Sequence, residues 1–175
     1  IPMRLTFLGT GTSTGVPSIA CDCETCLSDD PRDKRLRVSI LVEHKGKSIL
    51  VDTSSDFRQQ ALRANIRQLD AVLITHCHVD HVFGLDDLRR IFQYIFEPTH
   101  LGGGLPQLIP HTVFPGSPFC IGEVEVTPLE VIHGRLPVIA YRFNDFAYAT
   151  DLKTIPPESL DGLRGLDVLV LDCVR

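Results

Sequence analysis

The sequence predicts an α/β domain in which two β-sheets pack face to face and helices cover the outside. Three observations support this fold class. The chain is 43% hydrophobic and 22% charged, as in ordinary globular proteins. A hairpin comes early in the chain, and further strands mixed with helices follow it. The 175 residues contain no repeat and are enough for one domain with its own core.

The first half of the chain is expected to hold a strand, a hairpin and a capped helix. Residues 3–9 alternate in polarity and run into a glycine-rich loop, which predicts a strand. Residues 37–44 and 47–52 flank Lys45-Gly46, a dipeptide typical of hairpin turns. Residues 54–65 have a helical pattern that follows a Ser/Asp cap.

The second half is expected to alternate strands and helices. The nearly all-apolar segment 69–75 predicts a strand buried on both faces. A helix is expected over 85–96, and a short helix with Pro at its start and Gly at its end over 156–165. Residues 166–174 predict a last buried strand. Three further strands are expected at 122–134, 136–143 and 145–151.

Three histidines and one aspartate fall within six positions, directly after the apolar strand at 69–75. In extended backbone, residues two apart point the same way, so His76 and His78 can reach one point. The chain must then turn into a helix, so Asp80 and His81 face elsewhere. The pattern therefore predicts two metals, one on each pair, rather than a polar loop that is merely rich in histidine.

Neither pair of ligands is complete, because structural zinc takes about four ligands and catalytic zinc about three plus water. The missing ligands should end other strands. His133 closes the strand at 122–134, and Asp151 closes the strand at 145–151. Asp52 ends the second hairpin strand and could support the histidines from behind. Each residue alone would be explained as a strand-end cap, but together with the histidine cluster they indicate a metal site.

Three of the six cysteines lie close together in CDCETC, at Cys21, Cys23 and Cys26. In a reducing compartment such a cluster more often binds metal than forms a disulfide. The segment has no apolar core of its own, so zinc held by thiolates would stabilise it. A disulfide between two of the three, or a free reactive thiol, stays open as an alternative. The remaining cysteines are expected to be small core residues: Cys77, Cys120 and Cys173.

Charge and hydropathy exclude several classes of protein. The net charge of −5 and the pI near 5.8 argue against a long nucleic-acid footprint, which needs a basic stripe. The basic residues at 30–37 are interrupted by acids and predict a solvated loop. No apolar run reaches the roughly 18 residues of a membrane span. The first residues lack the features of a signal peptide, and with reduced cysteines this predicts a cytoplasmic protein.

The motif HCHVDH at 76–81, followed by His133 and Asp151, resembles the metal-ligand pattern of the metallo-β-lactamase superfamily of αββα hydrolases. The opening FLGTGTSTGVP together with CDCETC is similar to the PhnP-like cyclic phosphodiesterases, whose relatives include ribonuclease Z and the PqqB proteins. The resemblance covers residues 3–90 and 107–173. The histidine motif is shared by the whole superfamily, whereas the cysteine motif is more discriminating.

The resemblance implies a role for each of these residues. The implied ligands of two divalent metals, zinc or alternatively manganese or iron, are His76, His78 and His133 for the first, Asp80 and His81 for the second, and Asp151 for both. The three clustered cysteines would bind a separate structural zinc, together with a histidine near the C-terminus of the family's chains.

The sequence departs from the family pattern in two places. The family continues beyond the strand at 166–174, into a tail with a catalytic histidine, a second-metal histidine and the fourth ligand of the cysteine zinc. The family also has a further strand and helix where this chain passes from 85–90 into 91–100. We therefore expect 1–175 to be a single metallo-β-lactamase-like domain that is incomplete at its C-terminus and lacks a segment near residue 90.

The implied function is hydrolysis of a small, cyclic or nucleotide-like phosphodiester. The nucleophile would be a hydroxide held between two metals about 3.5–4 Å apart, with Asp80 orienting it. The resemblance implies that the general acid for the leaving group lies in the family's C-terminal tail, beyond the residues of this sequence. The glycine-rich loop at 102–106 leaves open whether the protein forms a homodimer.

Three alternatives use the same residues differently. A thioester hydrolase of the glyoxalase II kind shares the histidine motif but gives no reason for CDCETC. A ribonuclease Z-like nuclease conflicts with the acidic charge and with the cysteine cluster. A zinc-stabilised binding module without catalytic activity would have little reason to keep all six His and Asp ligands.

Overall fold

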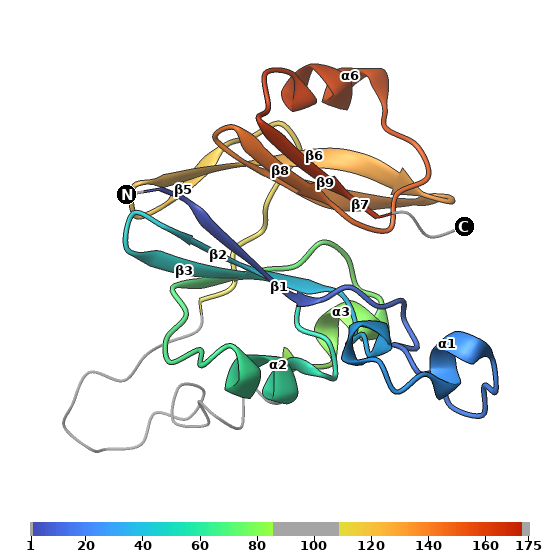
Figure 1. The fold of residues 1–175 in the computed structure, drawn as a ribbon. Helices are drawn as coiled ribbons and strands as arrows, with labels where there is room; N and C mark the ends of the chain where they lie inside the picture. The colour runs from blue at the N-terminus through green and yellow to red at the C-terminus, as the bar shows by residue number, and fades with distance from the viewer. Residues whose placement is uncertain (1, 86–108, 173–175) are drawn as a thin grey trace.

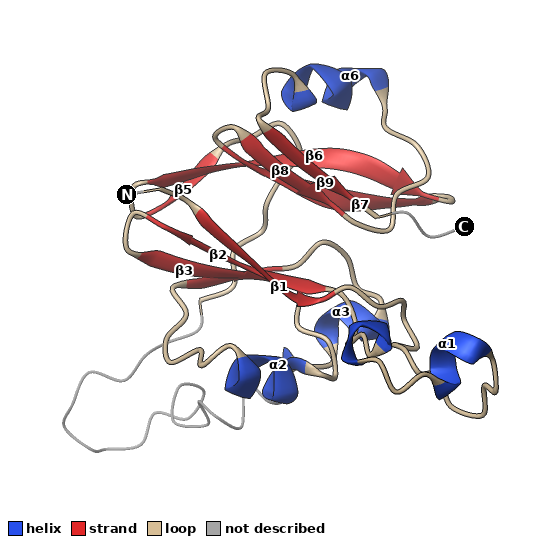
Figure 2. Ribbon diagram, viewed as in Figure 1, coloured by secondary structure: helices blue, strands red, loops and turns tan. Residues whose placement is uncertain are grey.

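The computed structural model describes residues 2–85 and 109–172, and in this part of the chain two β-sheets stack face to face (Figure 1). Helices α2 and α3 lie on the outer side of one sheet, and α6 lies on the outer side of the other (Figure 2). The expected α/β sandwich, with helices outside two packed sheets, is confirmed.

The first sheet has four strands in the order β1-β2-β3-β4. Its strands are β1 (Arg4–Gly9), β2 (Ser39–His44), β3 (Lys47–Val51) and β4 (Ala71–Leu73). The first three are antiparallel, while β4 pairs parallel to β3. Because β3 and β4 run parallel, their carboxyl ends meet at the same edge of the sheet.

The second sheet has five strands in the order β5-β6-β7-β8-β9. Its strands are β5 (Phe119–Ile121), β6 (Val124–His133), β7 (Leu136–Phe143), β8 (Phe146–Ala149) and β9 (Val168–Leu171). Only β8 and β9 are parallel. The sequence predicted four of these strands and missed β5, which extends the β6 hairpin.

The helices are short. They are α1 (Glu24–Leu27), α2 (Phe57–Arg63), α3 (Val79–Val82) and α6 (Pro157–Leu160), with 3-10 turns at Pro31–Asp33 and Asp161–Leu163. None of the helices within 2–85 and 109–172 is both long and apolar enough to cross a bilayer. The helix expected over 85–96, the loop at 102–106 and the segment expected to be missing near 90 lie outside the described residues.

Alternating side chains of the hairpin feed two cores. Ile40 and Val42 of β2 point into the layer between the sheets, whereas Leu41 points outward onto Phe57 of α2. The central layer is completed by Ile49 and Val51 of the first sheet and by Val124, Val126, Tyr141, Phe143 and Tyr148 of the second. Each fully buried aliphatic side chain stabilises the fold by about 1.5–3 kcal/mol. This layer fixes the strand ends of the first sheet relative to those of the second sheet.

The turn at Lys45-Gly46 is confirmed. Lys45 has φ 47° and Gly46 has φ 73°, and His44 pairs with Lys47 across the hairpin. Two successive positive φ angles define the type I′ turn, whose twist matches that of the flanking strands.

Of the predicted Ser/Asp cap of α2, the aspartate is wrong, whereas Ser54 Oγ accepts from the Asp56 backbone N at 3.1 Å just before the helix. Asp56 occupies the N-cap position, but its side chain caps no backbone N–H of the helix. Its Oδ2 instead accepts from the Arg37 backbone N at 2.9 Å, and its Oδ1 accepts from Arg37 Nη1 at 2.8 Å. A charged guanidinium is a stronger partner for a carboxylate than a helix N–H. The aspartate therefore anchors the start of β2 rather than the helix.

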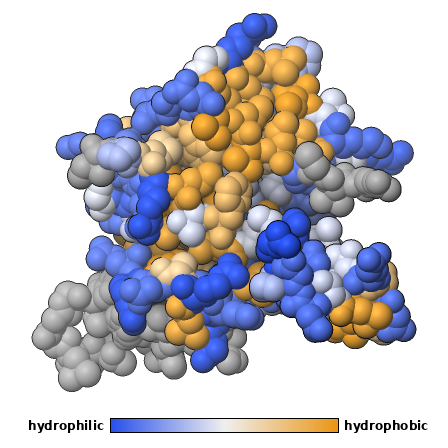
Figure 3. Space-filling model, viewed as in Figure 1, coloured by the Kyte–Doolittle hydropathy of each residue, from blue (hydrophilic) through white to orange (hydrophobic). Residues whose placement is uncertain are grey.

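The prediction of a last buried strand is also wrong. Val168, Leu169 and Leu171 of β9 are 50%, 41% and 42% exposed. Within the described residues β9 pairs only with β8 and forms the edge of its sheet. Figure 3 shows apolar side chains gathered on the surface where β9 lies. An apolar pattern predicts a strand, but it does not show whether both faces of that strand are covered.

Two of the expected core cysteines are exposed. Cys77 lies between His76 and His78, whose rings approach each other, so the alternation of extended backbone turns the Cys77 side chain to the other side, where it is exposed. Cys120 lies on the short edge strand β5 and is exposed as well. The third, Cys173, falls outside the described residues.

The glycine-rich loop after β1 packs tightly against residues 35–37. A Cβ on Gly9 would lie 1.9 Å from the Arg37 carbonyl oxygen, and one on Gly11 would lie 2.7 Å from that of Arg35. Only glycine permits this approach of two backbones. The contact fixes the loop beside the carboxyl ends of the strands.

Candidate metal centres

The residues predicted as metal ligands come from strand ends of both sheets. His76, His78 and His81 follow β4, and His133 is the last residue of β6. Asp52 follows β3 with φ 63°, and Asp151 follows shortly after β8 with φ 55°. Aspartate is one of the few residues that tolerate this left-handed conformation.

Asp52 is completely buried and binds the cluster from behind. Its Oδ1 accepts from the Thr75 backbone N at 2.8 Å. Its Oδ2 accepts from Thr75 Oγ1 at 2.8 Å and lies 2.7 Å from His81 Nδ1. This contact keeps a proton on Nδ1, so Nε2 is the nitrogen that a metal would bind.

The opposite nitrogen of His81 faces acidic groups without a hydrogen bond. His81 Nε2 is buried, and it lies 3.0 Å from Asp151 Oδ2 and 3.5 Å from Asp80 Oδ2. Among the residues that the structure describes, it makes no hydrogen bond. A buried ring nitrogen beside two carboxylate oxygens has the donor chemistry of a divalent metal site.

The charges around His81 favour a cation at this point. Burial lowers the pKa of His81, but the neighbouring carboxylates of Asp151 and Asp52 outweigh it and raise the pKa to about 10. Burial raises the pKa of Asp151, but contact with His81 outweighs this and brings it to about 2. The carboxylates of Asp80 and Asp151 therefore attract positive charge to the space in front of His81 Nε2.

The other histidines lie beside this group. His76 Nε2 lies 3.0 Å from His78 Nδ1, and the His133 ring centroid lies 5.4 Å from that of His78 and 6.0 Å from that of His76. Burial, helped by the charge of His81, lowers the pKa of His76 to about 4. His76 is therefore neutral near pH 7, which is the state that binds metals.

One close group joins residues of the two predicted sets. His76, His81 and Asp151 each offer a ligand atom, and these atoms lie within 4.8 Å of one another. His76 comes from the predicted first set, His81 from the second, and Asp151 is the residue that the resemblance assigns to both. The two sets thus adjoin, as a site with a shared ligand requires.

Two residues of the site were missed from the sequence. Thr75 links Asp52 to the histidines, because its Oγ1 also lies 3.0 Å from His76 Nδ1. Asp172 Oδ2 accepts from the Asp151 backbone N at 2.9 Å and holds that turn. Both carried the signal that identified Asp52 and Asp151, namely a polar residue at the end of an apolar strand.

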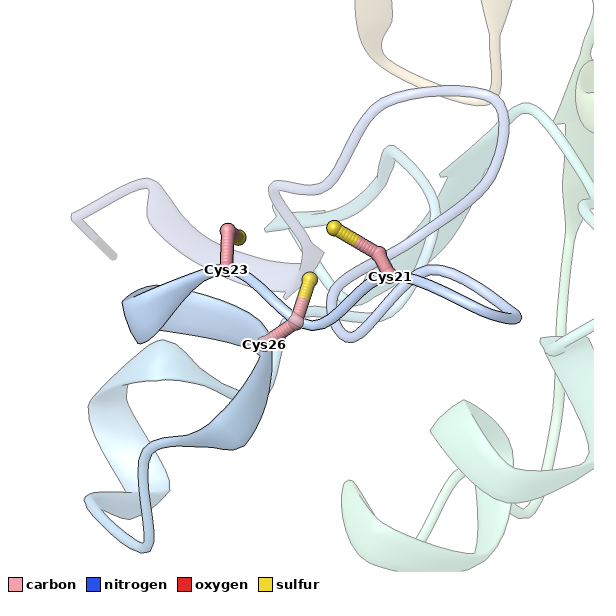
Figure 4. A group of neighbouring side chains, drawn as sticks. All are labelled: Cys21, Cys23 and Cys26. Carbon is pink, nitrogen blue, oxygen red and sulfur yellow. The ribbon is translucent and has the colours of Figure 1, made fainter.

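The three clustered cysteines form a second group. The sulfurs of Cys21, Cys23 and Cys26 lie within 4.8 Å of one another and face a common space (Figure 4). All three are free thiols. One helical turn over Glu24–Leu27, which the sequence did not predict, lies between Cys23 and the end of the cluster and brings Cys23 and Cys26 to the same side.

Backbone N–H groups donate to two sulfurs of this group, with opposite outcomes for their pKa. The Ser18 backbone N donates to Cys26 Sγ at 3.4 Å and lowers the pKa of Cys26, but Cys21, burial and Cys23 outweigh it and raise that pKa. The Cys26 backbone N–H and then the Cys21 thiol lower the pKa of Cys23. Thiolate is the form of cysteine that binds zinc.

A cavity of about 450 Å³ opens beside the His and Asp group. The glycine-rich loop lines one wall, and Thr150, Val170 and Leu171 from the strand ends line the other. Asp80 and Asp151 also line it. Its volume lies within the range of small-molecule sites.

A sequence profile described as "Beta-lactamase superfamily domain" matches residues 47–175. Among solved structures, a diphosphatase from the PhnP family is 39% identical with a TM-score of 0.83, and the match covers 96% of this chain and 73% of that one.

Two curated relatives carry different names. An octanoyltransferase of Porphyromonas gingivalis is 42% identical over 195 residues, which cover 99% of this chain and 39% of that protein. A ribonuclease Z of Bradyrhizobium diazoefficiens is 41% identical over 86 residues, which cover 48% of this chain and 23% of that protein. The chain thus spans well under half the length of these two relatives.

Replacing Asp52 by Asn should lower the affinity of the His and Asp group for zinc by about 10- to 100-fold. Asparagine offers one acceptor oxygen where the carboxylate offers two, so Thr75 or His81 loses its acceptor. Competition with a chromogenic chelator measures the affinity. Asp70→Asn is the matched control, because Asp70 pairs with Lys47 and Ser48 at the opposite end of β3. Equal zinc affinity in the two variants would contradict the role of Asp52.

Proposed function

The chain belongs to the metallo-β-lactamase superfamily and within it to the PhnP family, and on this premise we propose that it is a metal-dependent phosphodiesterase for small substrates. The observation that carries the proposal is His81 Nε2, which is buried, makes no hydrogen bond within the described residues and faces Asp151 and Asp80. Asp80 and Asp151 also line a cavity whose volume suits a small molecule.

We propose that the site holds two divalent metals. His76, His78 and His133 would bind the first, Asp80 and His81 the second, and Asp151 both. The close approach of His76, His81 and Asp151 supports a shared site. Nitrogen and carboxylate donors suit zinc, and also manganese or iron. When bound, such metals supply Lewis acidity and an activated water.

The chain's own residues would position the reacting groups. Asp80 stands in the first turn of α3 with its side chain 16% exposed, and it lines the cavity, so it can accept a hydrogen bond from the attacking water. Thr150 Oγ1 donates to Asp151 Oδ2 at 2.9 Å, and Asp172 holds the Asp151 backbone. These bonds orient Asp151 before any ligand arrives, which is how a preorganised site lowers a barrier.

Several observations favour a small phosphodiester over other substrates. The PhnP-family structure is named a diphosphatase and the matching nuclease cleaves RNA, so both relatives act at phosphorus. The net charge of −5 does not provide the basic stripe that a long nucleic acid needs.

A second candidate is an acyl substrate, such as a thioester. It is favoured by one observation, the name octanoyltransferase of the relative that is 42% identical. That name describes a protein of which this chain spans 39%. The two candidates differ in whether the site attacks phosphorus or carbon, and turnover separates them.

Asp80→Ala in the full-length protein should lower turnover of bis(p-nitrophenyl) phosphate by about 100-fold or more, because the attacking water loses its orienting carboxylate. The control is Asp161→Ala, since Asp161 forms only an exposed pair with Arg164. Steady-state rates on this ester and on an acyl thioester are compared for both variants and the wild type. Undiminished turnover in Asp80→Ala, or faster thioester hydrolysis by the wild type, would contradict the proposed function.

We propose that the cysteine group binds one structural zinc. The double change Cys21→Ser and Cys23→Ser should remove one zinc equivalent and lower the melting temperature, because metal ligation there contributes folding energy. Elemental analysis and thermal melting test this. Cys120→Ser, at an exposed thiol on β5, should change neither quantity. Full zinc content in the double variant would show that the cysteines hold no metal.

A further inference from the structure

The cavity beside the His and Asp group is lined by residues of two opposite kinds. Asp80, Asp151 and Asp172 supply carboxylate acceptors. The wall formed by the glycine-rich loop differs, because Arg35 lines the cavity there and is the one cationic residue among the described residues that do so. A guanidinium has five N–H donors and no acceptor, so this wall suits an anion rather than a metal.

The backbone of Arg35 is fixed against the loop. Arg35 N donates to the Val16 carbonyl at 2.8 Å, and Val16 N donates to the Arg35 carbonyl at 2.9 Å. A Cβ on Gly11 would lie 2.7 Å from the Arg35 carbonyl oxygen, so the two backbones are in close contact. Arg35 is also an exposed residue. Its guanidinium therefore extends from a fixed point beside the cavity, where a ligand can reach it.

The fold does not use the charge of Arg35. Within 2–85 and 109–172 its side chain makes no hydrogen bond and no ion pair, whereas the arginines on either side do. Arg32 pairs with Asp30. Arg37 pairs with Asp56 at 2.8 Å, and its Nε donates to the Ser13 carbonyl at 2.7 Å. Arg37 thus holds the loop in place, while Arg35 remains available to a ligand.

The loop adds further donors on the same wall. Thr12 and Ser13 line the cavity, and their backbone N–H groups make no hydrogen bond in the part of the chain that the structure describes. The loop keeps its shape without them, because Gly11 N donates to the Leu36 carbonyl and Gly15 N to the Thr12 carbonyl. Successive free N–H groups in a turn form a concavity that binds anions. An exposed arginine alone is ordinary, but a guanidinium beside such a turn in a cavity indicates an anion site.

We propose that Arg35 and the backbone N–H groups of Thr12 and Ser13 form a second anion subsite, which binds a phosphate group of the substrate other than the phosphodiester that is cleaved. This inference rests on the proposed function and names the substrate class as a small organic phosphodiester that carries a second phosphate. Guanidinium and phosphate form charge-assisted, bidentate hydrogen bonds. Phe7, 48% exposed, and Val170 line the same cavity and offer apolar surface to the organic part of the substrate.

Two esters that differ by one phosphate test the subsite, thymidine 5′-(p-nitrophenyl phosphate) and its 3′-phosphate. The full-length, metal-loaded wild type should have a kcat/KM about 10-fold higher on the 3′-phosphorylated ester, through a lower KM, because that phosphate gains a charge-assisted bond. Arg35→Gln should remove this preference and keep the wild-type kcat/KM on the other ester, with unchanged metal content and melting temperature. Lys34→Gln is the matched control and should keep the preference, since Lys34 is equally exposed but does not line the cavity.

Equal kcat/KM of the wild type on the two esters would overturn the subsite and leave the phosphodiesterase in place. An equal loss of preference in Arg35→Gln and Lys34→Gln would also overturn it and assign the preference to overall charge. If the wild type cleaves neither ester, the proposed function fails, and the Kd values of thymidine 3′,5′-bisphosphate and thymidine 5′-phosphate, measured by calorimetry, then decide on the subsite. Binding of the bisphosphate about 10-fold more tightly by the wild type but not by Arg35→Gln supports it, and equal affinities overturn it.

Discussion

The buried carboxylate of Asp52 is the interaction on which the site depends. Its side chain ties the end of β3 to Thr75 and to His81. Backbone hydrogen bonds join the same segments, since Asp52 N donates to the Leu73 carbonyl at 2.8 Å and Thr53 N to the His81 carbonyl at 2.8 Å. Burial raises the pKa of Asp52, and the contacts with His81 and Thr75 oppose that rise. In the folded protein this buried charge depends on the same contacts that orient His81, so the fold and the candidate metal site depend on one set of bonds.

The sandwich architecture brings the remaining groups to this point. Asp52 and the three histidines after β4 belong to one sheet, while His133 and Asp151 belong to the other. Neither sheet carries a complete set of ligands, so the core between the sheets determines whether the two halves meet.

Much of this could be predicted from the sequence, because the decisive signals are local. A two-residue turn fixed the hairpin at Lys45, and strand-end polar residues identified Asp52 and Asp151. The failures have two causes, which are competition from partners distant in the sequence and apolar faces whose covering a local pattern does not show. Asp56 would cap α2 if Arg37 were not beside it, and β9 looks buried because its pattern is apolar.

Anomalous X-ray diffraction from crystals of the zinc-loaded, full-length protein, collected on both sides of the zinc edge, tests the central claim most directly. The account predicts two neighbouring peaks among His76, His78, Asp80, His81, His133 and Asp151, with Asp52 still bonded to His81 Nδ1 and not to a metal. A separate peak should lie among the three clustered cysteines. A single peak or none at the His and Asp group, or a metal bound directly by Asp52, would contradict the account.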